Sequence, residues 1–234
     1  MINTLLFDLD GTLLPMDQEE FIKLYFKGLY VKFHDTFDYD LLSKSIWAGT
    51  AAMVANTGEL TNEEVFWNVF TKQMNVKKED VEDSFTNFYK NEFSIAKGAT
   101  EANHEIIDCI HRLKQEGYTI VAATNPLFPR VATENRLKWA GFDPGDFELI
   151  TTYENSSYCK PNLNYYKEIL AKLNKQPEEC LMAGNDNQED MCAEQLGIRG
   201  HLIDNCLINR ENAPITCTWR GDWTAFIRWC RENL

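Results

Sequence analysis

The sequence lacks the features that mark membrane, exported and disulfide-stabilised proteins. No apolar run approaches the roughly 18 residues that a membrane-spanning helix needs. No basic flank precedes the first apolar stretch, because the first lysine is Lys23. The seven cysteines are odd in number and form no CxxC pair, so neither a zinc site nor a disulfide framework is indicated. We therefore expect a soluble, cytoplasmic protein with reduced thiols.

Positive charge is also scarce. The chain has 23 lysines and arginines against 36 acidic residues, a net charge of −13 at pH 7. This excess of negative charge repels nucleic-acid backbones and anionic lipids, so neither nucleic acid nor a membrane surface is an expected partner. With 234 residues, 44% of them hydrophobic and 25% charged, the chain has an ordinary globular composition. It is long enough for one large domain or for a domain with an insertion.

Short apolar runs alternate with segments of helical periodicity along most of the chain. The runs that have the length and composition of buried strands are residues 4–10, 118–124, 147–152 and 180–184, with a weaker one at 201–204. The segments with apolar residues three or four positions apart are residues 100–116, 129–140, 162–173 and 188–196, with a last helix at 223–230. This alternation predicts an α/β fold, in which a Rossmann-like parallel sheet has helices on both faces.

Residues 15–97 interrupt this alternation directly after the first strand. The segment is too long for a loop, and its apolar residues recur with helical spacing. Thr61 with Glu64 forms a capping-box pattern at the start of one expected helix. The segment also holds 15 of the 29 aromatic residues, enough for a small core of its own. We therefore expect a core domain of residues 1–14 and 98–234, with a mainly α-helical domain of residues 15–97 inserted into it.

The first strand ends in the sequence Asp8-Leu9-Asp10-Gly11-Thr12. Two carboxylates two positions apart at a strand end lie on the same side of the chain, and Gly11 permits a sharp turn beside them. Such a pair is typical of a site for a hard divalent cation. A DxD pattern by itself is more often only a polar strand end, so its meaning depends on the residues at the ends of the other strands.

The other strands end in polar residues of a similar kind. Thr124 and Asn125 follow the second strand, Lys160 follows the third, and Asp186 and Asp190 follow the fourth. Taken singly, such residues are more often a helix cap, a solvated lysine or an acidic helix start. All of them, however, fall at the carboxyl ends of parallel strands, where open α/β sheets place their ligand sites. The pattern therefore indicates one shared site.

In this order and with this insertion, the chain resembles the haloacid dehalogenase superfamily, which is dominated by magnesium-dependent phosphatases and phosphotransferases. The first motif of that family, DxDGT, matches residues 8–12 without departure. The second motif, a strand-end serine or threonine, matches Thr124, and the third, a lysine, matches Lys160. The fourth, an acidic GDxxxD-like element, matches residues 184–190. The insertion resembles the helical cap of one large branch.

The resemblance implies a role for each matched residue. It implies that Asp8 is the nucleophile, that Asp10 is the proton donor and later the base, and that the other catalytic residues are Thr124 and Lys160. The residues that it implies for binding the substrate phosphate are Asp8, Gly11, Thr12, Thr124, Asn125 and Lys160. The ligands that it implies for Mg²⁺ are Asp8, Asp10 and Asp186, with support or an alternative ligand from Asn185 and Asp190. Asn185 stands where many members have an aspartate, so the choice between Asn185 and Asp186 stays open, although a carboxylate is the better ligand.

The resulting hypothesis is a Mg²⁺-dependent hydrolase of small phosphate monoesters that acts through an aspartyl-phosphate intermediate. Its expected partner is a small phosphorylated metabolite, and its expected assembly is a monomer or small homo-oligomer. The alternatives are a phosphomutase, a non-catalytic phosphate-binding protein, and a phosphonatase with a Schiff base on a cap lysine such as Lys23, Lys27 or Lys32. Asp10 argues against a true dehalogenase, because dehalogenases of this superfamily lack the second aspartate of the first motif. A receiver domain is disfavoured by the long insertion and the amino-terminal DxDGT.

Three further expectations concern side chains near these motifs. The aromatic residues of the insertion are expected to form its own core and not a substrate-binding box. Arg130 is expected on a helix surface, with a substrate contact as the alternative. Cys159 is expected to be an inert thiol, although its place beside Lys160 leaves oxidation sensitivity as the alternative.

Overall fold

Six parallel strands form one sheet in the order β3-β2-β1-β4-β5-β6 in the computed structural model, which describes residues 1–234. The strands are β1 (Thr4–Phe7), β2 (Thr119–Ala122), β3 (Leu149–Ile150), β4 (Cys180–Gly184), β5 (Arg199–Ile203) and β6 (Trp219–Gly221). The central strand β1 pairs with β2 and β4, and its last residue, Phe7, is level with Ala122 and Ala183. The predicted α/β fold with a parallel sheet is confirmed.

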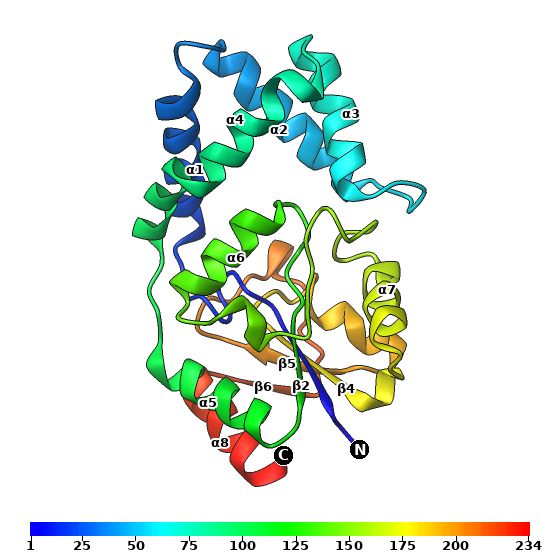
Figure 1. The fold of residues 1–234 in the computed structure, drawn as a ribbon. Helices are drawn as coiled ribbons and strands as arrows, with labels where there is room; N and C mark the ends of the chain where they lie inside the picture. The colour runs from blue at the N-terminus through cyan, green and yellow to red at the C-terminus, as the bar shows by residue number, and fades with distance from the viewer.

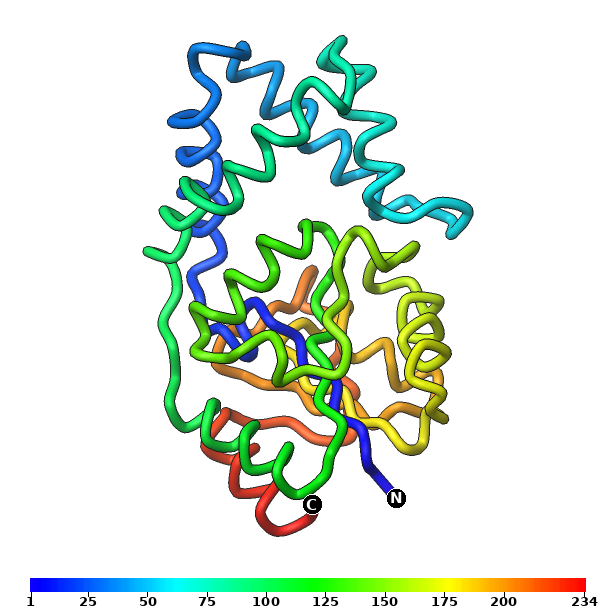
Figure 2. The backbone as a smooth tube through the Cα atoms, in the orientation of Figure 1, coloured from blue at the N-terminus to red at the C-terminus, as the bar shows by residue number.

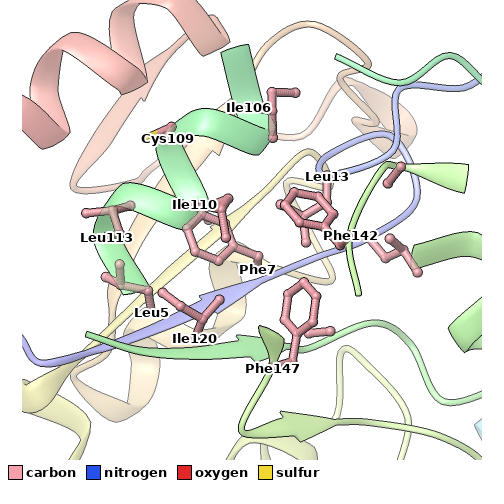
Figure 3. Packing of buried hydrophobic residues seen from close by; sticks show 14 of the residues in the cluster. Leu5, Phe7, Leu13, Ile106, Cys109, Ile110, Leu113, Ile120, Phe142 and Phe147 are labelled. Atoms are coloured by element: carbon pink, nitrogen blue, oxygen red, sulfur yellow. The ribbon is translucent and has the colours of Figure 1, made fainter. Parts of the chain in front are cut away.

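Helices cover both faces of this sheet (Figure 1). One face is covered by α5 (His104–Gln115), α6 (Arg130–Trp139) and α8 (Trp223–Asn233), and the other by α7 (Leu163–Leu173) and the 3₁₀ helix η4 (Met191–Leu196). Because side chains alternate along a strand, Leu5 and Phe7 join the first hydrophobic cluster and Leu6 joins the second. Figure 3 shows Ile110 and Leu113 of α5 packed beside β1 and β2 in the first cluster.

A helical insertion follows β1. It consists of α1 (Gln18–Phe33), α2 (Tyr39–Val54), α3 (Asn62–Met74), α4 (Lys78–Lys90) and the 3₁₀ helix η1 (Glu92–Ala99). These elements share an aromatic-rich cluster of 18 buried residues, to which the α/β unit contributes only Ala132 and Cys159. The predicted capping box is present, since Thr61 and Glu64 bond reciprocally at the start of α3. The inserted helical unit is therefore observed as predicted.

The chain enters and leaves the insertion along the same side of the molecule (Figure 2). Met16 and Thr100 form an antiparallel bridge, and the backbone N–H of Asp17 donates to the carbonyl of Ala99 at 3.0 Å. This bridge between the entering and leaving segments lies next to the ends of the predicted segment 15–97. That residues 15–97 form a separate domain stays a prediction.

Several elements differ from the sequence prediction in length or type. The predicted helix 188–196 begins only at Met191 and is a 3₁₀ helix, because the side chains of Asp186 and Asp190 bind backbone N–H groups of residues 186, 188 and 189 and form a turn there. The predicted strand 147–152 is reduced to the two residues of the edge strand β3. The edge strand β6 was not predicted. None of the helices is both long and apolar enough to cross a bilayer.

Candidate active site

The polar residues that follow the strands meet at the carboxyl edge of the sheet. Since β1, β2 and β4 end level with one another, the chain delivers Asp8, Thr124 and Asn185 to the same edge. A cavity of about 190 Å³ lies there, and its lining includes seven of the predicted site residues: Asp8, Asp10, Thr124, Asn125, Asn185, Asp186 and Asp190. Lys160 lies beneath this lining and contacts it. Gly11 and Thr12 do not line the cavity, but both contact the side chain of Asn185, which does.

Lys160 is the centre of a buried ionic triad. It is 2% exposed, and its Nζ donates to Asp8 Oδ1 at 2.8 Å and to Asp190 Oδ1 at 2.7 Å. Burial raises the pKa of Asp8 to about 6 and that of Asp190 to about 7, although the charge of Lys160 acts in the opposite direction. Burial also disfavours the charged form of Lys160, but the two carboxylates outweigh this and hold its pKa well above the ordinary value. Lys160 therefore stays protonated, whereas its single positive charge does not fully offset the burial of the two carboxylates of Asp8 and Asp190.

The approach of Asp190 to this triad depends on Gly184. A Cβ atom at Gly184 would lie 2.1 Å from Asp190 Oδ2, so only glycine leaves room for the carboxylate. That oxygen accepts the backbone N–H of Asp186 at 2.9 Å, and the other oxygen of Asp190 binds Lys160. The end of β4 is therefore built to place Asp190, which the sequence predicted only as metal support or an alternative ligand.

Asp10 is paired with an arginine that the sequence reasoning missed. Arg136 of α6 is 1% exposed, donates from Nη1 to Asp10 Oδ2, and has its guanidinium 4.5 Å above the ring centre of Phe128. The other oxygen of Asp10, Oδ1, is buried and has no hydrogen-bond partner. Burial raises the pKa of Asp10, while Arg136 and Lys160 lower it. The sequence could have indicated that Arg136 is buried, because it lies on the apolar face of its helix, four residues after Ala132 and next to Leu137.

Asn185 and Asp186 both line the cavity but are held differently. Asn185 accepts from the Thr12 hydroxyl at 2.9 Å and donates to the Cys206 carbonyl at 2.7 Å. Its carboxamide lies against Gly11, where a Cβ atom would be 2.4 Å from Nδ2 and where φ is +86°. Asp186 Oδ1 accepts two backbone N–H groups, and its Oδ2 accepts from Arg210 at 2.6 Å. Because each side chain already has partners, the choice of metal ligand between them stays open.

Thr124 and Asn125 form a fixed corner of the cavity. The carbonyl of Thr124 accepts from the hydroxyl of Thr151 at 2.6 Å and from that of Tyr165 at 2.9 Å. The carboxamide of Asn125 bridges the backbone N–H of Lys160 and the carboxylate of Glu189. The backbone N–H of Asn125 donates to no backbone carbonyl. This corner therefore offers a hydroxyl and an amide to an anion in the cavity.

The charges around the cavity fit a divalent cation. Five lining residues are acidic, and three cationic residues pair with them, which leaves two negative charges uncompensated. The acidic residues are Asp8, Asp10, Asp186, Glu189 and Asp190, and the cationic ones are Arg136, Lys160 and Arg210. Carboxylates are the preferred ligands of Mg²⁺. The charge of the cavity therefore suits Mg²⁺, but no three acidic, histidine or cysteine side chains converge on one point, and Asp10 and Asp186 are paired with arginines. The side chains as they stand match the charge of the ion without forming a complete set of ligands.

A second cavity of about 620 Å³ lies between α6 and the helical insertion. It adjoins the first, because Asp10, Gln18, Leu127 and Phe128 line both. The aromatic residues of the insertion form its own core, as expected, and some of the same residues, among them Phe66 and Phe85, also line this cavity.

The lysines of the insertion, including Lys23, Lys27 and Lys32, supply no amine to these cavities. No lysine lines either cavity, which leaves a cap lysine nucleophile without support. Arg130 lines the larger one, but its Nε bonds to Glu134 at 2.7 Å. Cys159 is buried, and burial raises the pKa of its thiol to about 12, as expected for an inert group.

Comparisons with known proteins agree with this architecture. The sequence model of the family of haloacid dehalogenase-like hydrolases matches residues 2–207. A pyrophosphatase PpaX of Bacillus cereus is 24% identical over 194 residues, which cover 83% of this chain and 79% of the relative. The HAD hydrolase YfnB of Bacillus subtilis, described as bound to magnesium, is 18% identical with a TM-score of 0.58 over 98% of this chain and 99% of that one.

A predicted phosphoglycolate phosphatase from Haemophilus somnus is also similar, with 18% identity and a TM-score of 0.56 over 97% of both chains. At these identities the two solved structures establish a likeness of fold alone.

Proposed function

The chain belongs to the haloacid dehalogenase-like hydrolases, and from this premise we propose that it is a Mg²⁺-dependent phosphatase that hydrolyses small phosphate monoesters through an aspartyl-phosphate intermediate. The observation that carries the proposal is the buried Asp8–Lys160–Asp190 triad on a cavity shared with Thr124, Asn125 and Asp186. The names of the relatives, a pyrophosphatase and a phosphoglycolate phosphatase, support a phosphorylated substrate.

Asp8 is the proposed nucleophile. Its Oδ1 is bound by Lys160, which leaves Oδ2 to attack the phosphorus in line with the leaving oxygen. A carboxylate with a pKa of about 6 is ionised at neutral pH yet poorly stabilised by its buried surroundings. Attack breaks the bond between phosphorus and the ester oxygen, and water then hydrolyses the aspartyl-phosphate to release phosphate and restore Asp8.

Asp10 is the proposed acid and base. It protonates the departing ester oxygen and then takes a proton from the attacking water. This role requires two neighbouring carboxylates in different protonation states. Their surroundings differ, since Asp8 is bound to Lys160 whereas Asp10 is bound to Arg136 and keeps one buried oxygen without a partner. Arg136 fixes the direction of Asp10 and is in our proposal a positioning residue.

The phosphoryl oxygens are proposed to lie against the Thr124 hydroxyl and the backbone N–H of Asn125, while Lys160, buried beneath Asp8, supplies positive charge to the same end of the cavity. Gly11 and Thr12 are proposed to hold the turn that carries Asp10. Asp8 and Asp186 are the proposed side-chain ligands of Mg²⁺, with Asp10 or Asn185 completing the set and Asp190 supporting it through Lys160. The bound ion would supply positive charge that offsets the repulsion between Asp8 and the anionic substrate.

Of the alternatives, a phosphonatase is least supported, because no lysine lines either cavity. A phosphomutase would need the same triad and differs only in the fate of the phosphoryl group. The test is release of p-nitrophenol from p-nitrophenyl phosphate with Mg²⁺, followed by EDTA. We expect turnover that EDTA abolishes and that added Mg²⁺ restores. Absence of turnover with Mg²⁺, or turnover unaffected by EDTA, would contradict the proposal.

A further inference from the structure

The larger cavity is lined mainly by apolar surface. Of its 25 lining residues 15 are hydrophobic, and they come from α1, α2, α3 and α4 as well as from the core. Among them are Phe26 and Trp47, whose rings stack at 5.5 Å between centres. A volume of about 620 Å³ is far more than a phosphate group requires and falls in the range of about 300–1,000 Å³ that is usual for sites of drug-sized organic molecules.

The polar side chains of this cavity are predominantly negative. Five of the lining residues are acidic, namely Asp10, Glu63, Glu82, Glu134 and Glu154, and one, Arg130, is basic. Arg130 is already bound to Glu134 at 2.7 Å. Lys78 reaches Glu63 and Glu82 from outside, at 2.9 and 3.3 Å. The cavity therefore has no spare cation with which to bind a second anionic group of a substrate.

The position of Asp10 connects this cavity to the proposed chemistry. Asp10 lines both cavities, and in the proposed mechanism it protonates the ester oxygen as the bond to phosphorus breaks. With the phosphate against Asp8 in the smaller cavity, as proposed above, the rest of the ester would extend past Asp10 and Phe128, which line both cavities, into the larger one. The lining of the larger cavity thus faces the leaving group.

We infer that the substrate of this site, given the phosphatase activity proposed above, is a phosphate monoester whose leaving group has an extended apolar or aromatic surface and no negative charge. An apolar group gains by leaving water for the aromatic lining. A carboxylate or second phosphate in the same place would lose its hydration and meet the acidic side chains without a compensating cation. Inorganic pyrophosphate and phosphorylated short-chain carboxylic acids are therefore expected to be poor substrates.

The test compares alkyl esters whose leaving groups have similar chemical reactivity. These are ethyl phosphate, n-hexyl phosphate and 6-phosphooxyhexanoate, assayed with Mg²⁺ for phosphate release. Because each buried methylene favours binding, we expect kcat/KM for hexyl phosphate to exceed that for ethyl phosphate by at least about tenfold. The ester with the terminal carboxylate should fall at least about tenfold below hexyl phosphate. Equal values for the three esters, or a preference for the carboxylate, would overturn the inference.

Trp47 provides a variant that should not disturb the fold. It is 51% exposed on α2 and lines the cavity, whereas Leu41 is 41% exposed on the same helix and does not. We expect Trp47→Ala to lower kcat/KM for hexyl phosphate about three- to tenfold, the range of one aromatic contact, and to change that for ethyl phosphate less than about twofold. Leu41→Ala should change neither value. Equal losses on both esters in Trp47→Ala would contradict the assignment of the cavity.

Binding separates this inference from the proposed function. Calorimetric titration of the Asp8→Asn protein with the same three esters measures preference without turnover. A preference for hexyl phosphate supports the inference even where the wild-type protein hydrolyses no ester, in which case the phosphatase proposal alone fails. Turnover of all three esters without any binding preference would overturn the inference and leave the phosphatase proposal intact.

Discussion

The ammonium nitrogen of Lys160 lies 2.8 Å from Asp8 Oδ1, although 152 residues separate the two along the chain. The same nitrogen lies 2.7 Å from Asp190 Oδ1, and all three residues are buried. This one side chain therefore joins the end of β1 and the turn that follows β4 to the loop that precedes α7. The contact has consequences for both stability and catalysis.

Removal of the ammonium should affect both properties. Lys160→Ala leaves Asp8 and Asp190 buried without a counterion, so we expect a loss of roughly 3–5 kcal/mol in the free energy of unfolding, measured by urea denaturation. In protein that remains folded, turnover should fall at least ~100-fold because one preorganised charge contact is lost.

Lys160→Arg is the second variant should the alanine variant fail to fold, and Lys23→Ala is the control. Lys23 is 75% exposed and pairs with Glu20, so its removal should change the unfolding free energy by less than about 1 kcal/mol. A folded Lys160 variant with wild-type turnover would remove this lysine from the site.

The pairing of Arg136 with Asp10 predicts a change in pH dependence. Arg136 lowers the pKa of Asp10, which burial raises, so Arg136→Met should raise that pKa further. If Asp10 donates the proton, it then stays protonated to higher pH, and the alkaline limb of the kcat profile should move upward. The measurement is kcat against pH for wild type, Arg136→Met and the exposed α6 control Lys138→Met. An unmoved limb would argue against Asp10 as the acid.

Close packing at Gly184 predicts a large effect from one methyl group. In Gly184→Ala the new Cβ atom would lie only 2.1 Å from Asp190 Oδ2, so the carboxylate must move. This movement should weaken the contact between Asp190 and Lys160. We expect a loss of about 1–3 kcal/mol in stability and a fall of at least about tenfold in turnover. Gly98→Ala, where the nearest atom is 3.4 Å away, is the matched control and should be nearly silent. Equal behaviour of the two variants would show that the placement of Asp190 is unimportant.

The raised pKa of Asp8 predicts how the stability of the metal-free protein varies with pH. The ordinary pKa is 3.8 and the folded value is about 6, so the folded state binds the proton more tightly. The contribution of Asp8 to folding is therefore fully favourable below about pH 4 and is lost as the pH rises through 6. Asp8→Asn removes this dependence, so its stability relative to wild type should increase between pH 4 and pH 7 in urea denaturation. A constant difference would contradict the raised pKa.

Local sequence signals predicted much of the fold. The capping box of Thr61 and Glu64 depends on neighbours a few positions away, and it is observed. The first buried strand, predicted over residues 4–10, is observed over the shorter range of residues 4–7. The edge strand β6 has only three residues and pairs with β5 alone, so its sequence carries no strong strand pattern. Residues 186–190 form a turn and not a helix, because acidic side chains there bind the backbone instead of solvent.

The sequence predicted that the polar residues at the strand ends would meet, but not which other residues would contact them. Asp8, Thr124 and Asp186 lie on one cavity because parallel strands end together. The partners Arg136 and Arg210 come from a helix and a loop whose spatial relation to Asp10 and Asp186 depends on tertiary packing, which no local pattern encodes. The large aromatic cavity was missed for the same reason, since aromatic periodicity looks the same for a filled core and for the wall of a cavity.

The most direct test of the proposed mechanism replaces Asp8 by asparagine. The variant should fold, because Lys160 keeps its contact with Asp190 at 2.7 Å, and circular dichroism would check this. Release of p-nitrophenol from p-nitrophenyl phosphate with saturating Mg²⁺ is then measured for wild type and variant. We predict turnover by the wild-type protein and none above background by Asp8→Asn, since a carboxamide is a poor nucleophile. Turnover by the folded variant near the wild-type rate would contradict the role of Asp8 as nucleophile.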